Sequence, residues 1–87
     1  MFEATAAEGS GHPVGEVRYP LVMVPAQAEA EAVEAAIRAL AERHWANPLV
    51  RRVERFRAEP ESLLPPLDEA AAKAFAGEPG IVVFDQP

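Results

Sequence analysis

The longest periodic stretch of the chain runs from Ala26 to Asn47. Apolar or aromatic residues recur there at helical spacing, at Val33, Ile37, Leu40 and His44. Charged residues lie mostly on the opposite side, at Glu31, Glu34, Arg38 and Glu42. The pattern predicts an amphipathic helix of about five turns. We expect it to end at Asn47-Pro48, because Asn tolerates a left-handed conformation and proline disfavours a helical predecessor.

Two short apolar runs are typical of strands that are buried on both faces. The first spans Glu16 to Val24 and is rich in β-branched and aromatic residues. The second spans Ile81 to Phe84, directly after Pro79-Gly80. Because Pro20 has no amide proton, we expect the first strand to be irregular there or to lie at a sheet edge.

The segment Leu49 to Ala58 supports two readings. As a helix, its apolar residues form one stripe, and Asn47-Pro48 would begin it. As a strand, the segment would have charged side chains on both faces, but such side chains protect edge strands from pairing with other chains. We favour an edge strand, because a sheet with only two other strands needs a third.

The remaining segments complete the expected order of elements. Residues 1–15 contain three glycines and a proline, which predicts a flexible N-terminal arm before a single domain at residues 16–87. A proline-rich crossing loop follows the middle segment, and its leucines, Leu63, Leu64 and Leu67, are expected to contact the core. Asp68 is a candidate N-cap for a short helix, Glu69 to Ala76, that ends at Gly77.

This alternation predicts a small two-layer β-α-β-α-β fold of the α/β class, with α+β as the alternative and helices on one face. A chain of 87 residues buries only about 60 to 65 percent of its unfolded surface, and much of its apolar content is alanine. We therefore expect oligomerisation, or docking onto a larger protein, to complete the open sheet.

Composition narrows the class of protein. The chain has no cysteine, no apolar run long enough to span a bilayer and no secretory start, so we expect a cytoplasmic protein without a membrane partner. The dominance of Arg over Lys and the single Asn are compatible with a thermophile. The net charge of −6 and the lack of interleaved aromatic residues make nucleic acid an unlikely partner.

Basic side chains gather in the middle of this acidic chain. The ordinary explanation is ion pairing with the Glu-rich flanks. The alternative is a site for an anionic or phosphorylated metabolite beside the helix end, in a ligand-binding protein or a small dimeric enzyme. Its candidate residues are His44, Trp45, Arg51, Arg52 and Arg55. Trp45 has a structural reading too, as the anchor of helix to sheet.

Catalytic and metal-binding patterns are lacking in the sequence. Without cysteine, the candidate hydroxyl nucleophiles are Thr5, Ser10 and Ser62, all of which lie in predicted loops without a nearby base motif. His12 and His44 belong to no metal-ligand motif, so we predict no metal and no cofactor. The sequence therefore favours a non-catalytic interaction or oligomerisation module.

The segment His12 to Phe56 resembles a known family. It combines V-x-x-V-R at Val14 to Arg18, an apolar strand, a long helix, and A-N-P-L-V-x-x-V at Ala46 to Val53. This order is similar to the PurS family, the small structural subunit of formylglycinamidine ribonucleotide synthetase. The resemblance implies a strand after Asn47-Pro48 and a role as an accessory subunit of a larger enzyme.

Overall fold

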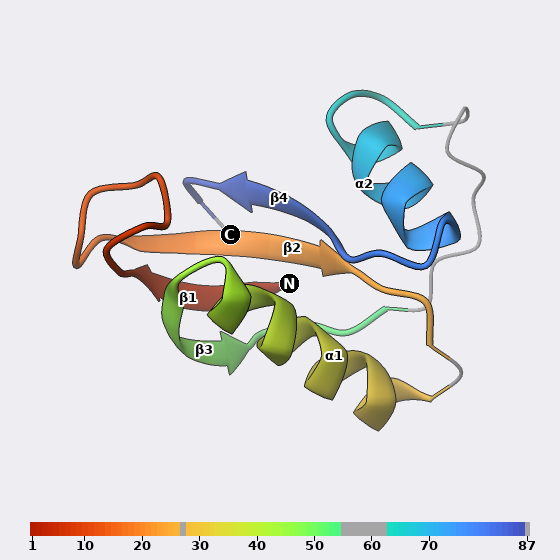
Figure 1. Cartoon of the computed structure of the whole chain (residues 1–87), viewed down its shortest axis with the longest axis horizontal. Coiled ribbons are helices and arrows are strands. Elements are labelled where there is room, and N and C mark those ends of the chain that lie inside the picture. Colours follow the sequence, from red (N-terminus) through yellow and green to blue (C-terminus); the bar gives the residue numbers. More distant parts are fainter. Residues whose placement is uncertain (27, 55–62, 87) are drawn as a thin grey trace.

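The chain forms a four-stranded antiparallel sheet with two helices packed on it. The computed structural model describes residues 1–26, 28–54 and 63–86. The strands are β1 (Phe2–Ala6), β2 (Val17–Met23), β3 (Trp45–Val50) and β4 (Gly80–Phe84), in the spatial order β3-β1-β2-β4 (Figure 1). The helices are α1 (Glu29–Glu42) and α2 (Leu67–Phe75). The predicted small α/β or α+β fold is thus confirmed, with one more strand than expected.

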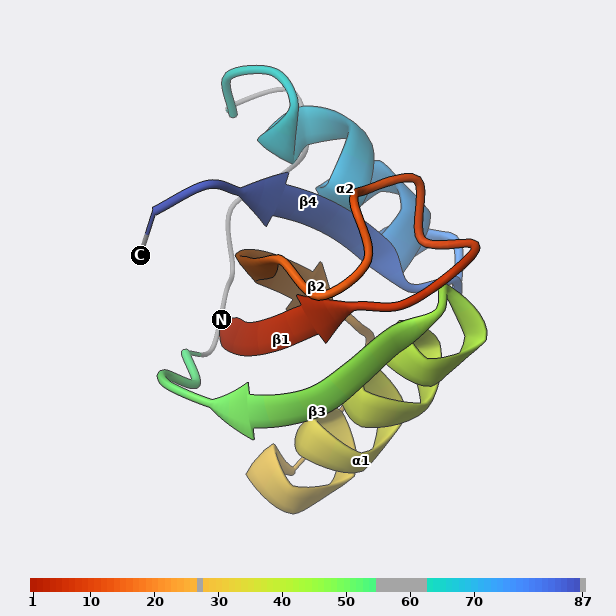
Figure 2. The same cartoon turned by 90° about the vertical axis from the view of Figure 1, so that its left-hand side faces the viewer.

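The additional strand, β1, lies in the segment for which the sequence predicts a flexible arm. It occupies the middle of the sheet, between β3 and β2 (Figure 2). Its inward residues, Phe2, Ala4 and Ala6, are at most 4% exposed, and Glu3 and Thr5 alternate with them. The arm prediction is wrong for these residues, because a period-two pattern built on alanine carries little apolar signal. The three glycines serve the connection between β1 and β2, all with positive φ.

Helix α1 is shorter than the sequence predicts at both ends. It ends at Glu42, and Arg43 follows as its C-cap. The chain reverses at His44, whose φ is 65°, and continues at once into β3. Asn47 has the left-handed conformation expected of it, with φ 51°, but it lies within β3 and does not end a helix.

The core lies between α1 and the sheet. Leu40 is completely buried, and it packs with Phe2, Trp45 and the alanines that face them, Ala4, Ala6 and Ala36. Ile37, which the helical pattern also places on the apolar stripe, is 38% exposed. The buried face of α1 is therefore centred on Ala36, Ala39 and Leu40.

Strand β3 partly confirms the strand reading of the middle segment. Leu49 and Val50 pair with Glu3 and Phe2 of β1, and β3 forms one margin of the sheet, as expected. The strand begins earlier than predicted, at Trp45, and ends at Val50. Residues 55–58 of the predicted strand lie outside the described residues.

Helix α2 packs against β4 at the other margin of the sheet. It begins at Leu67, so Asp68 lies in its first turn and is not the N-cap, which is Pro66. Gly77, with φ 89°, follows the last turn as predicted. Of the three leucines expected on the core, Leu64 is 81% exposed, whereas Leu63 and Leu67 are half-buried.

Alternate residues of β4 face the two helices. Ile81 and Val83 pack against the core cluster that α1 covers. The backbone of Ala70 in α2 lies where a Cβ atom on Gly80 would point. Since successive residues of a strand face opposite sides, α2 contacts the other side of β4. The expectation of helices on one face therefore does not hold along β4.

Pro20 restricts the hydrogen bonding of β2 with both of its neighbours. Pro20, which is fully buried, lies opposite Val83, and the neighbouring pairs are Tyr19/Phe84 and Leu21/Val82. Strand β2 is a central strand, so Pro20 does not mark an edge. The ladder between β1 and β2 contains only two pairs, the last at Ala4/Arg18. Hydrogen-bonded pairs recur at every second residue of an antiparallel strand, so the next such residue of β2 after Arg18 is Pro20. Pro20 has no amide proton to donate to β1.

Candidate functional site

The first candidate site is a groove where α1 meets β3. It has a volume of about 400 Å³ and is lined by the β1–β2 connection, the end of α1 and two residues of β4: Gly9, Ser10, Glu42, Arg43, His44, Trp45, Ile81 and Val83. His44 adopts its left-handed conformation here. A Cβ atom on Gly9 would lie 2.9 Å from Cδ2 of His44, so the imidazole ring lies directly against the Gly9 backbone.

Trp45 forms the floor of this groove and belongs to the core. Its side chain is 5% exposed, which confirms that it anchors the helix end to the sheet. His12, from the β1–β2 connection, lies over it with ring centroids 5.2 Å apart and planes inclined by 48°. The structure therefore gathers both histidines of the chain around Trp45, which their separation of 32 positions in sequence did not predict.

The arginines that the sequence assigns to the same site lie elsewhere. Arg51 and Arg52 follow the far end of β3, whereas His44 precedes its start. Arg51 donates to Glu3 at 2.9 Å, and its guanidinium lies 5.6 Å from the centre of the Tyr19 ring. Arg52 pairs with Glu54 at 2.5 Å. The predicted five-residue site is thus divided, and Arg55 lies outside the described residues.

The backbone after β3 also forms a hydrogen bond with the start of the chain. The Met1 amino group donates to the Arg52 carbonyl oxygen at 2.7 Å. Desolvation by burial lowers the pKa of this amino group, and nearby Glu54 opposes that shift. The Arg51 side chain and the Arg52 backbone thus hold β1 beside the end of β3. The Arg51–Glu3 pair agrees with the expected pairing to the Glu-rich flanks, whereas Arg52 pairs with Glu54 within the basic segment.

The groove is lined by the charged residues Glu42 and Arg43 and by the apolar residues Trp45, Ile81 and Val83. Among residues 1–26, 28–54 and 63–86, no group of three His, Asp or Glu residues is placed to hold a metal ion. Nor does any helix of the described chain have the length and apolarity to cross a membrane. The side chains of Arg43 and His44 could meet an anion, with Ser10 as a hydroxyl donor.

The second candidate site is the outer edge of β4. In an antiparallel ladder, hydrogen-bonded and non-hydrogen-bonded pairs alternate. Pro20 cannot exchange two hydrogen bonds, so its pair with Val83 is non-hydrogen-bonded, and the Val22/Ile81 pair is too. The amide and carbonyl groups of Ile81 and Val83 therefore point away from β2. No backbone hydrogen bond from elsewhere in the described chain reaches them.

The two margins of the sheet differ in their protection. Strand β3 contains Asn47-Pro48, with a left-handed φ at Asn47 and a register shift opposite Glu3 and Thr5. Such irregularities and prolines prevent further strands from pairing. Strand β4, with the sequence GIVVF, pairs without a shift over its whole length and has neither proline nor charge. The unprotected edge of this sheet is β4.

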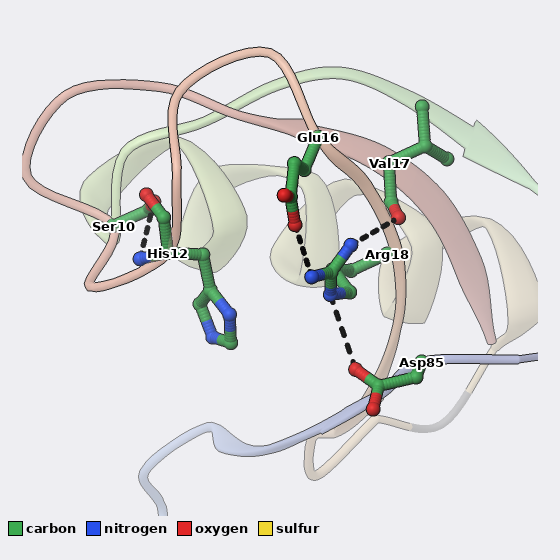
Figure 3. A network of polar contacts seen from close by, with 6 residues as sticks. All are labelled: Ser10, His12, Glu16, Val17, Arg18 and Asp85. Atoms are coloured by element: carbon green, nitrogen blue, oxygen red, sulfur yellow. Dashed lines mark hydrogen bonds and ion pairs between the residues drawn. The ribbon is translucent and has the colours of Figure 1, made fainter.

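Arg18 links the end of β4 to the start of β2. Its Nε lies 3.1 Å from Oδ1 of Asp85, and Nη1 donates to the Val17 carbonyl at 3.0 Å (Figure 3). It also forms an ion pair with Glu16. Because Asp85 is 85% exposed, this pair adds little free energy, but it orients the chain directly after β4.

A comparison with known protein families, curated proteins and solved structures finds no match. The two candidate sites therefore rest on the geometry of the described residues. The resemblance of His12 to Phe56 to the PurS family stays a prediction, and it does not extend to α2 or β4.

Proposed function

We propose that this chain is a non-catalytic interaction module that associates with other protein chains through the edge of its sheet. The observation that supports it best is the edge of β4, where Ile81 and Val83 present backbone donors and acceptors without a partner among the described residues. An uncharged, regular edge strand is a ready template for another strand.

The thin core supports the same proposal. Of the ten buried hydrophobic residues in the described chain, six are alanines, which contribute little apolar area. Large apolar side chains are exposed instead, among them Leu64 at 81% and Phe75 at 68%, just before α2 and at its end. Because α2 packs beside β4, a chain that paired with β4 would approach this apolar surface.

The association itself is tested by sedimentation velocity of the purified chain. We expect an oligomer that forms with rising concentration in the micromolar range, because strand addition buries both backbone groups and apolar surface. Light scattering gives an independent mass. A stable monomer over that whole range would contradict self-association as the function.

A second candidate function is the binding of a small anionic ligand in the groove at His44. It is favoured by the left-handed conformation of His44, because sparsely populated backbone conformations tend to gather at functional sites. A volume of about 400 Å³ is sufficient for a small metabolite. Benzoate and inorganic phosphate are suitable probes, since Arg43 and His44 line the groove.

Replacement of His44 by glycine separates strain from ligand binding. We expect His44→Gly to raise the free energy of unfolding by about 1 kcal/mol, because glycine adopts positive φ without a steric penalty. Thermal unfolding measures this change. If the groove binds an anion, benzoate or phosphate will stabilise the wild type and have less effect on His44→Gly. No shift with either probe would exclude this candidate for these ligand classes.

A further inference from the structure

The outward backbone groups of β4 are arranged symmetrically. Ile81 and Val83 each present one donor and one acceptor, and they are equally distant from Val82. A half-turn about an axis at Val82 places Ile81 of one strand opposite Val83 of the other. We propose that a second copy of this chain pairs antiparallel with β4, with Val82 of both copies at the twofold axis. This inference rests on the proposed association function.

One register satisfies all of these groups. With the axis at Val82, both Ile81/Val83 pairs become hydrogen-bonded pairs, and the two Val82 residues form the non-hydrogen-bonded pair between them. With the axis at Ile81 or at Val83, one such pair remains at the centre, and the other outward residue lies opposite Pro79 or Asp85, which are outside β4. The sheets of the two copies would then form one continuous sheet with β3 at each margin.

The charges near β4 permit a second copy at this position. The strand contains no charged residue, so no like charges meet within the pair. At the end of the strand, Asp85 would lie beside Pro79 of the second copy, and Asp85 is already paired with Arg18. Closed twofold dimers are also the commonest homo-oligomers of soluble proteins.

Cysteine cross-linking tests the register, because the natural chain has no cysteine. In the proposed dimer, the Val82 Cα atoms are about 4.5 Å apart, within the range of a disulfide. We expect Val82→Cys to form a covalent dimer under mild oxidation. The matched control is Val83→Cys, whose Cα atoms would be about 8 Å apart, too far for a disulfide. Preferential cross-linking of Val83→Cys would overturn the register.

Proline at position 83 tests the edge without disturbing the ladder to β2. The Val83 amide points away from β2, so Val83→Pro removes an outward donor and leaves the bonds within the chain. We expect association at least about tenfold weaker than in Val83→Ala, which also loses the side chain but keeps the amide. Circular dichroism verifies that both variants are folded.

The outcomes separate this inference from the proposed function. A wild-type oligomer that survives Val83→Pro, or that does not cross-link through Val82→Cys, would overturn pairing at β4 but leave association intact. A wild-type monomer would remove the association function as well. An oligomer weakened by Val83→Pro and captured by Val82→Cys supports both.

Discussion

Gly80→Ala will destabilise the protein by about 3 kcal/mol or more, at the upper end of the range for overpacking. A Cβ atom at this position would lie 2.1 Å from the carbonyl oxygen of Ala70 and 2.5 Å from its Cα. Both atoms belong to the backbone of α2, so no side-chain rotation relieves the contact. The helix must move away from β4, which exposes Ala70 and Val82. Thermal denaturation followed by circular dichroism measures the loss, expected to lower the melting temperature by more than about 10 °C.

Gly11→Ala is the matched control for this substitution. Gly11 has φ 85°, and a Cβ atom there meets nothing within 4 Å. Its replacement therefore costs only the backbone penalty of about 1 kcal/mol. Equal stability losses in the two variants would show that α2 does not lie against Gly80.

The parts of the fold that the sequence predicts are those with large side chains in regular patterns. Strands β2 and β4 follow from apolar runs around Leu21 and Val82, and α1 follows from its helical periodicity. Strand β1 is missed because two of its three inward residues are alanines, Ala4 and Ala6, which burial alone distinguishes from loop residues. A neighbouring strand on each side stabilises β1. A local pattern of apolar and polar residues does not reveal this tertiary pairing.

The end of α1 illustrates a different limit. The sequence offers Asn47 as a left-handed helix stop, whereas the structure uses His44, a residue with a weaker preference for that conformation. Burial of Trp45 in the core explains the choice, because a strand that starts at Trp45 places its indole beside Leu40. Packing of one large side chain thus overrides the local propensity of the residues around it.

The candidate sites, too, are predicted only in part from the sequence. His44 and Trp45, which are adjacent in sequence, both line the groove, but Arg51 and Arg52 lie at the other end of β3. Open sheet edges follow from the small number of strands, yet the sequence does not tell which edge is unprotected. That distinction depends on which strands form the margins, and the register of Pro20 against Val83 then sets which residues of β4 face outward.

Leu40→Ala will have the second large effect, because Leu40 is completely buried and joins α1 to the sheet. Removal of a buried leucine side chain costs about 2 to 5 kcal/mol, through lost burial and the cavity that remains. The surrounding alanines, Ala4, Ala6 and Ala36, are too small to fill that space, so we expect about 3 kcal/mol or more. Urea denaturation of Leu40→Ala beside the wild type measures the difference.

Ile37→Ala provides the comparison within the same helix. Ile37 lies less than one turn before Leu40 and loses nearly the same volume, but it is 38% exposed. We expect a loss of about 1 kcal/mol, since only part of its side chain is removed from water in the native state. If Ile37→Ala were instead the more damaging substitution, α1 would pack through the stripe that helical periodicity predicts. The same result would require a different orientation of α1 on the sheet, and with it a different floor for the groove at His44.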